Sequence, residues 1–78
     1  MPHIVIKTLR GKSQEQLQEA AKQAAAAVSK TLGKPEKFFS VAVEEYESDQ
    51  WPEVYEEEIK DNDNVLVKPG YSNPVTFE

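Results

Sequence analysis

The residue that offers the most chemistry is the proline at position 2. The initiator methionine is usually removed when the next residue is small, so loss of Met1 would expose a secondary amine. Burial beside apolar groups disfavours the charged form of such an amine and lowers its pKa. An amine that titrates near the working pH can take a proton from a carbon next to a carbonyl, and the ring of Pro2 holds the nitrogen rigidly. Pro2 is therefore the candidate general base, although a Met-Pro start alone is weak support for catalysis.

Other familiar catalytic and metal-binding arrangements are missing from the sequence. The lack of cysteine excludes a cysteine nucleophile, a disulfide and a cysteine-based metal site. His3 is the single histidine, so a Ser-His-Asp triad would depend on a residue at the head of a strand. The glycines are isolated, which excludes a phosphate-binding loop. The run 61–64 opens like a calcium loop but lacks the glycine and glutamate that complete one, which favours a solvated turn.

The first half of the chain predicts a strand, a helix and a second strand. Residues 3–9 contain β-branched side chains and read as a buried strand, followed by a turn at 10–12. Ser13 and Gln16 form a capping box, an apolar stripe at helical spacing follows, and Gly33 ends a helix over 14–32. Residues 38–45 alternate as a strand, with Phe39, Val41 and Val43 on one face. The expected fold class is α/β, a βαβ unit with parallel strands and a right-handed crossover.

The second half predicts a short helix and an edge strand. Ser48 or Asp49 can cap the helix, and Pro52 is tolerated in its first turn. Trp51, Tyr55 and Ile59 recur at helical spacing, which favours a core or interface stripe, with Trp51 placed to line a cavity. Residues 65–68 are expected to form a short edge strand, and the tail over 72–78 is expected to be loose.

Length and charge limit the remaining choices. A chain of 78 residues allows one domain, 1–78, and a single copy buries too little surface to be more than marginally stable. One helix covers one face of a two-stranded sheet, so we expect the other face, apolar and bare, to meet a second copy. The net charge of −5 argues against nucleic acid, and no apolar run suits a membrane span or a signal peptide. The expected location is the cytoplasm.

The net charge is unevenly distributed along the chain. Residues 1–37 hold seven basic and three acidic side chains, a balance of +4, whereas residues 38–78 hold two basic and eleven acidic ones, a balance of −9. Two solvated faces of opposite sign explain this pattern most simply. The basic half contains Pro2 and can steer a small anionic acid toward it, while the acidic half keeps a small oligomer soluble or complements the basic half across a subunit interface.

Several short segments, in order and spacing, resemble the 4-oxalocrotonate tautomerase family, and among its members the PptA-type tautomerases. These segments are 1–7, 9–13, 39–43 with Trp51 eight residues beyond, 58–59 and 68–72. The resemblance covers about residues 2–72. It implies a βαβ protomer in which Pro2 moves a proton between two positions of the enol or keto form of a small 2-oxo acid, without metal or cofactor. It also implies a homodimer, or a hexamer as in the shorter members.

The chain departs from the hexameric members at two positions. Lys12 stands where they carry an arginine after the turn glycine, with Arg10 two residues earlier, and Ser40 stands where they carry a second arginine. Arginine holds a carboxylate through two parallel hydrogen bonds, whereas lysine acts as a point charge. We therefore expect a monoacid, its carboxylate held by Lys12 or Arg10 and its 2-oxo oxygen by Ser40. Its tail is expected to lie against Trp51 and Phe39.

Two alternatives to a tautomerase stay open at this point. The lost arginine allows a non-catalytic assembly or binding protein on the same fold, which docks a partner through its acidic half. Pro2 also allows a hydratase-type reaction on an unsaturated acid. If Met1 is retained, the nitrogen of Pro2 is an amide and cannot act as a base, so the mature N-terminus separates the catalytic alternatives from the non-catalytic one.

Overall fold

The computed structural model describes residues 1–72 and divides the chain into two compact units. The first unit spans Met1–Glu45 and the second begins at Tyr46. No helix within residues 1–72 is both long enough and apolar enough to cross a membrane. The expected loose tail lies outside the described residues from position 73 onward.

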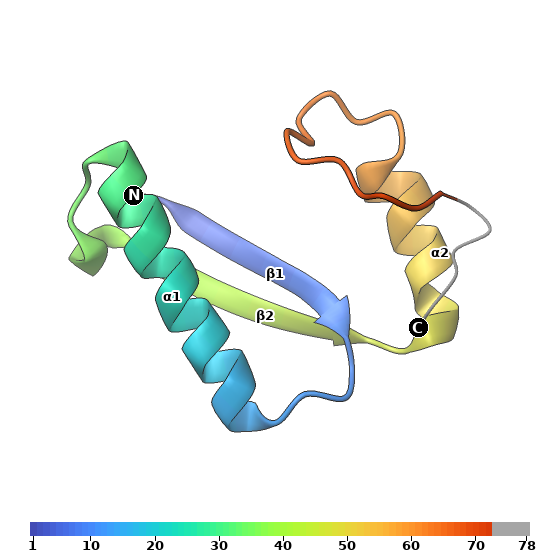
Figure 1. Ribbon diagram of the computed structural model, residues 1–78, viewed down its shortest axis with the longest axis horizontal. Coiled ribbons are helices and arrows are strands. Elements are labelled where there is room, and N and C mark those ends of the chain that lie inside the picture. The colour runs from blue at the N-terminus through green and yellow to red at the C-terminus, as the bar shows by residue number, and fades with distance from the viewer. Residues whose placement is uncertain (73–78) are drawn as a thin grey trace. The chain divides into compact units, whose positions relative to one another are not determined.

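The first unit is the expected βαβ arrangement. Strand β1 spans His3–Leu9, helix α1 spans Gln14–Leu32 and strand β2 spans Ser40–Tyr46. The two strands lie side by side in one sheet and run in the same direction, with α1 crossing one face (Figure 1). The predicted bounds of β1 and α1 are confirmed residue for residue.

Both ends of α1 are fixed by the residues that predicted them. The Gln16 amide donates to the Ser13 hydroxyl at 3.1 Å, and the Gln16 side chain accepts from the Ser13 amide at 3.0 Å. These two bonds satisfy two backbone N–H groups that a helix start leaves without partners. At the other end Gly33 adopts a left-handed conformation, with φ of 68°, and its amide donates to the Ser29 carbonyl. A glycine reaches this conformation without steric cost, which explains why the helix stops there.

Strand β2 begins two residues later than the sequence predicted. The expected strand included Phe38, but Glu36–Phe38 form a 3₁₀ turn, η1. The amides of Phe38 and Phe39 donate to the carbonyls of Pro35 and Glu36 at 3.1 and 2.9 Å. Because these donors are used within the turn, pairing with β1 begins only at Ser40. Alternation of side chains therefore starts at Ser40 as well, and Phe38 belongs to neither face of the sheet.

The sheet face that α1 leaves uncovered is more polar than expected. His3 Nδ1 lies 2.6 Å from the Ser40 hydroxyl oxygen, and Lys7 forms an ion pair with Glu44 at 3.7 Å. The apolar part of this face includes Val5, which is 44% exposed. The prediction of an apolar face was therefore wrong in part, because paired polar groups flank the apolar centre.

The second unit is built from three consecutive helical segments. They are a 3₁₀ turn η2 over Ser48–Gln50, helix α2 over Trp51–Val54 and a π-helical segment η3 over Tyr55–Ile59. The expected helix is thus present, but the residue before it differs. Glu47, rather than Ser48 or Asp49, stands at the start, and its amide donates to the Gln50 side chain at 2.7 Å. The reason is that the 3₁₀ turn η2 precedes α2, so Ser48 and Asp49 lie inside the helical segment rather than before it.

The segment after η3 turns back and contains no strand up to Ser72. The Asn62 side chain donates to the Glu58 carbonyl at 2.8 Å and accepts from the Asn64 amide at 3.0 Å, so 61–64 is a closed turn. The expected edge strand over 65–68 is wrong for the single chain, where Leu66 and Val67 are 90% and 89% exposed. The Val65 amide donates to the Asn62 carbonyl at 3.0 Å, and the sheet formed by residues 1–72 contains β1 and β2 only, so no neighbouring strand pairs with this segment.

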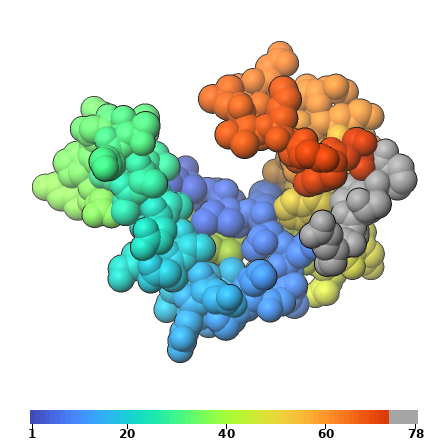
Figure 2. Space-filling view, viewed as in Figure 1, coloured from blue at the N-terminus to red at the C-terminus, as the bar shows by residue number. Residues whose placement is uncertain are grey.

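Few side chains are buried. Among the described residues the buried hydrophobic side chains are Leu17, Val54 and Tyr55, and each keeps 7 to 9% of its surface exposed. Atoms from the start of the chain reach the surface beside α1 in Figure 2, drawn in blue. A core this thin agrees with the expectation that one copy is only marginally stable.

The capping role of Ser13 at the start of α1 can be tested directly. Replacing Ser13 by alanine removes the acceptor for the Gln16 amide and should lower the free energy of unfolding by about 1 kcal/mol. Thermal and urea unfolding followed by circular dichroism measure the change. Ser13→Asp keeps an acceptor and should stay near the wild-type value. Equal destabilisation by both substitutions would contradict the capping role.

Candidate functional site

Pro2 borders a cavity in the first unit. The cavity has a volume of about 400 Å³ and is lined by Met1, Pro2, Gly33, Lys34, Pro35 and Phe38. Two separate segments form it, the start of the chain just before β1 and the loop that follows α1. Pro2 is half-buried, whereas Met1 is 96% exposed. The volume falls in the range of small-ligand sites, and Pro2 combines partial burial with access to this space.

Ser40 lies directly beside Pro2 through the backbone. Its amide donates to the Pro2 carbonyl at 3.2 Å, which in a parallel pair of strands places Ser40 opposite His3, the residue after Pro2. The Ser40 hydroxyl contacts His3 Nδ1 at 2.6 Å. The sequence reasoning singled out Ser40 but missed His3 as its partner. Strand register would have found it, because the position after Pro2 on β1 shares a face with Ser40.

Phe38, rather than the expected Phe39, lies at the cavity beside Pro2. Phe39, the predicted substrate contact, is half-buried just before β2 and is not among the residues that line the Pro2 cavity. Phe38 does line the cavity and is 42% exposed, with the Lys37 ammonium 5.2 Å from the centre of its ring. The 3₁₀ turn explains this difference, because it takes Phe38 out of strand alternation while Phe39 stays extended just before β2.

Arg10 and Lys12 lie beyond the opposite end of β1 from Pro2. Seven residues of strand at about 3.3 Å each separate the two ends by roughly 20 Å. Arg10 lies 4.0 Å from the Glu45 carboxylate, and no carboxylate within residues 1–72 forms an ion pair with Lys12. One chain therefore joins Ser40 to Pro2 through the backbone, but Ser40 is not among the residues that line the Pro2 cavity, and neither cation reaches it.

Trp51 belongs to the second unit and is held by an aromatic cluster. Its indole N–H donates to the Tyr71 hydroxyl at 3.0 Å, and its ring forms a T-shaped pair with Tyr46 at a centroid distance of 6.0 Å. Tyr71 also packs against Tyr55, with ring centroids 5.6 Å apart. Because the indole N–H is already bonded, Trp51 offers an apolar ring rather than a donor. Sequence reasoning missed Tyr71, for which helical spacing carries no signal.

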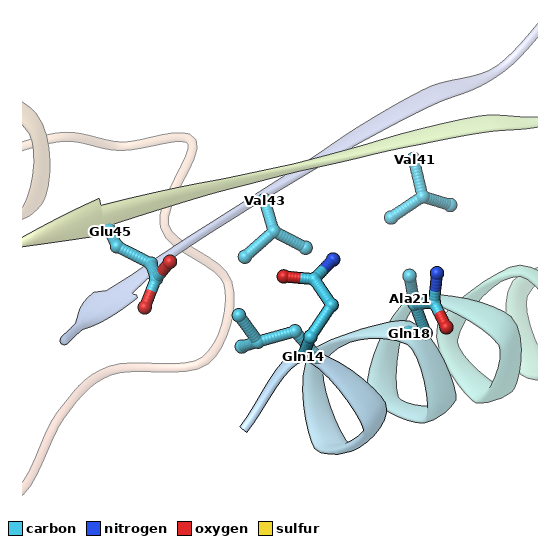
Figure 3. A pocket seen from close by; sticks show the side chains of 7 residues that line it. Gln14, Gln18, Ala21, Val41, Val43 and Glu45 are labelled. Atoms are coloured by element: carbon cyan, nitrogen blue, oxygen red, sulfur yellow. The ribbon is translucent and has the colours of Figure 1, made fainter. Parts of the chain in front are cut away.

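A second cavity of the first unit lies between α1 and β2 (Figure 3). It measures about 290 Å³ and is lined by Gln14, Leu17, Gln18, Ala21, Val41, Val43 and Glu45. Val41 and Val43 point from β2 toward the helix, and the Gln14 amide extends into the space between them. Its one titratable side chain, Glu45, lies within ion-pair distance of Arg10. The Pro2 cavity is therefore the better candidate for proton-transfer chemistry.

Comparison with known proteins gives consistent matches. The family model described as "Tautomerase enzyme" matches residues 2–61. A probable tautomerase of Xylella fastidiosa is 38% identical over 73 residues, covering 91% of this chain and 89% of the relative. Tautomerase PptA of Pectobacterium carotovorum is 40% identical over 75 residues, covering 92% and 99%. The crystal structure of YwhB, a homologue of 4-oxalocrotonate tautomerase, superposes with a TM-score of 0.59 at 31% identity, covering 62% of this chain and 79% of YwhB.

The bond between Trp51 and Tyr71 can be tested through a single signal. Trp51 is the only tryptophan, so its indole N–H gives one resonance in a nitrogen–hydrogen correlation spectrum. Tyr71→Phe keeps the ring but removes the acceptor, and the exchange of this hydrogen with solvent should become several-fold faster. Tyr55→Phe keeps its ring contact with Tyr71 and should leave the exchange rate unchanged. The assignment fails if both variants exchange at the wild-type rate.

Proposed function

Because the chain belongs to the tautomerase family, we propose that it interconverts the enol and keto forms of a small 2-oxo acid and that Pro2 moves the proton. The family places the enzyme among tautomerase-type isomerases. The observation that carries the finer proposal is the position of Pro2, half-buried on a cavity of about 400 Å³ at the start of the chain.

The accessible first residue supports this role for Pro2. Met1 is 96% exposed and lines the same cavity, so its removal frees the Pro2 nitrogen and opens space beside it. The freed nitrogen carries one lone pair on a rigid ring. Such a group can accept a proton and return it without large movement of the backbone.

The proposed reaction needs only one proton carrier. The Pro2 nitrogen accepts the hydroxyl proton of the enol, and the electron pair of the O–H bond forms the carbonyl. The electrons of the carbon–carbon double bond then take a proton from the Pro2 ammonium at the third carbon. The nitrogen returns to its neutral form, so neither metal nor organic cofactor enters the reaction.

Recognition of the substrate is proposed to involve two copies of the chain. Arg10 and Lys12 lie about 20 Å from Pro2 along β1, so a cation from this turn can serve only the cavity of another copy. The thin core supports the same conclusion, because a homodimer buries surface that one copy leaves exposed. Lys12 is the stronger candidate, since Arg10 lies next to Glu45. The monoacid preference, the bond from Ser40 to the 2-oxo oxygen and the tail contacts of Trp51 and Phe39 remain part of this proposal.

A non-catalytic binding protein is the competing function. The identity of the mature N-terminus separates the two, because an enzyme that uses Pro2 must have lost Met1. Mass spectrometry of protein from its native source gives the answer directly, and a retained Met1 would favour the binding role. Hydration of an unsaturated acid is the third candidate. Replacing Pro2 should lower the rate of that reaction too, so it can be assayed with the same Pro2 variants.

Replacement of Pro2 tests the proton transfer. Pro2→Ala leaves a more flexible primary amine, and the rate of ketonisation of phenylenolpyruvate should fall by about 10²- to 10⁴-fold. A form with one residue inserted before Pro2 has an amide nitrogen and should lose the enzymatic rate. The measurement is the decrease in enol absorbance, with the start of each protein verified by mass. Wild-type rates in both forms would remove Pro2 from the mechanism.

Mixing two inactive variants tests whether one site uses two chains. In a dimer of Pro2→Ala and Lys12→Met chains, one of the two sites has both residues intact. Random exchange of subunits should then restore about a quarter of the wild-type rate, although each variant alone is slow. A mixture of Pro2→Ala with Pro2→Ala,Lys12→Met chains is the control and should stay inactive. If the first mixture gains no activity after verified exchange, both residues act within one chain or Lys12 has no role.

A further inference from the structure

The cavity beside Pro2 contains a cation of its own chain. Lys34 lines the cavity together with Pro2 and is the one charged side chain among the described residues that do so. No carboxylate within residues 1–72 forms an ion pair with it, and its side chain is exposed. An anion that enters this space to reach Pro2 therefore meets Lys34.

The backbone of Lys34 is held on both sides. Its amide donates to the Ser29 carbonyl at 3.1 Å, and its carbonyl accepts from the Ser29 hydroxyl. Gly33 precedes it in a left-handed conformation, and Pro35 follows with φ of −62°. The base of the Lys34 side chain is thus fixed at the cavity, and its four-carbon stem lets the ammonium adjust to a ligand.

The end of α1 favours a cation over an anion at this cavity. A helix C-terminus carries partial negative charge, which attracts a lysine and repels a carboxylate. Gly33 and Lys34 stand at this end of α1 and line the cavity. Lys34 lines the cavity itself and offsets this partial charge there, while Lys37 lies 5.2 Å from the ring of Phe38 at its border.

We propose that Lys34 binds the carboxylate of the substrate in the same cavity as Pro2, with the exposed ring of Phe38 against its apolar tail. This inference rests on the proposed function and adds a residue that determines preference for acids. It makes each chain carry the proton carrier and one anion-binding group, so that a cation from a second copy adds to binding rather than supplying all of it.

Full-length proteins with verified removal of Met1 provide the test. The substrates are phenylenolpyruvate and its methyl ester, which differ in charge at the carboxyl group. Lys34→Met should lower kcat/KM for the acid about five- to tenfold and change that for the ester less than twofold. Lys34→Arg should keep most of the preference for the acid. Lys30→Met removes a cation from the last turn of α1 outside the cavity and should change neither value.

A binding measurement separates failure of this inference from failure of the proposed function. Titration with 3-phenylpropanoate should shift the amide resonances of Gly33 and Lys34, whereas 3-phenylpropanamide should not, and Lys34→Met should abolish the shift. The role of Lys34 is overturned if Lys34→Met lowers kcat/KM equally for the acid and the ester, or changes it for neither. If wild type and Pro2→Ala turn over both substrates equally, the tautomerase mechanism fails. A shift that depends on Lys34 would then still support the anion site.

Discussion

The parallel pairing of β1 with β2 is the constraint on which the rest of the first unit depends. A right-handed crossover through α1 requires both strands to start at the same edge of the sheet. The bond from the Ser40 amide to the Pro2 carbonyl marks that edge. It brings the first residues of the chain next to the loop that ends α1, and the Pro2 cavity forms where these segments meet. The same geometry sends the turn at 10–12 to the far edge.

Small size is the reason why the proposed homodimer would add stability. A two-stranded sheet with one helix covers only one of its faces, and the described side chains include few that are buried. The uncovered face combines an apolar centre at Val5 with the Lys7–Glu44 ion pair and the His3–Ser40 contact. The polar groups of this face already have hydrogen-bond or ion-pair partners within the chain. The proposed second copy could therefore bury the face without leaving those groups unsatisfied.

Aromatic side chains stabilise the short helix of the second unit. Four residues of α2 and five of η3 are too few to be stable through backbone hydrogen bonds alone. Trp51, Tyr55 and Tyr71 add ring contacts and the bond from the indole N–H to the Tyr71 hydroxyl. These contacts tie the segment after the turn at 61–64 back to the helix. Here the stabilising pairs are distant in sequence, which is why helical spacing alone did not reveal Tyr71.

Sequence alone determined the elements whose signals are local. The capping pair Ser13 and Gln16, the stop at Gly33 and the β-branched start of β1 act within a few residues, so the predicted bounds of β1 and α1 held. Tertiary structure decided what depends on groups far apart in the chain. The turn before β2 moved Phe38 rather than Phe39 to the cavity, and strand direction separated Arg10 and Lys12 from Pro2. Residues 65–68 join no sheet, because no strand within residues 1–72 lies beside them. Lys34 became a site residue for the same reason, because only the folded crossover places the end of α1 beside the start of the chain.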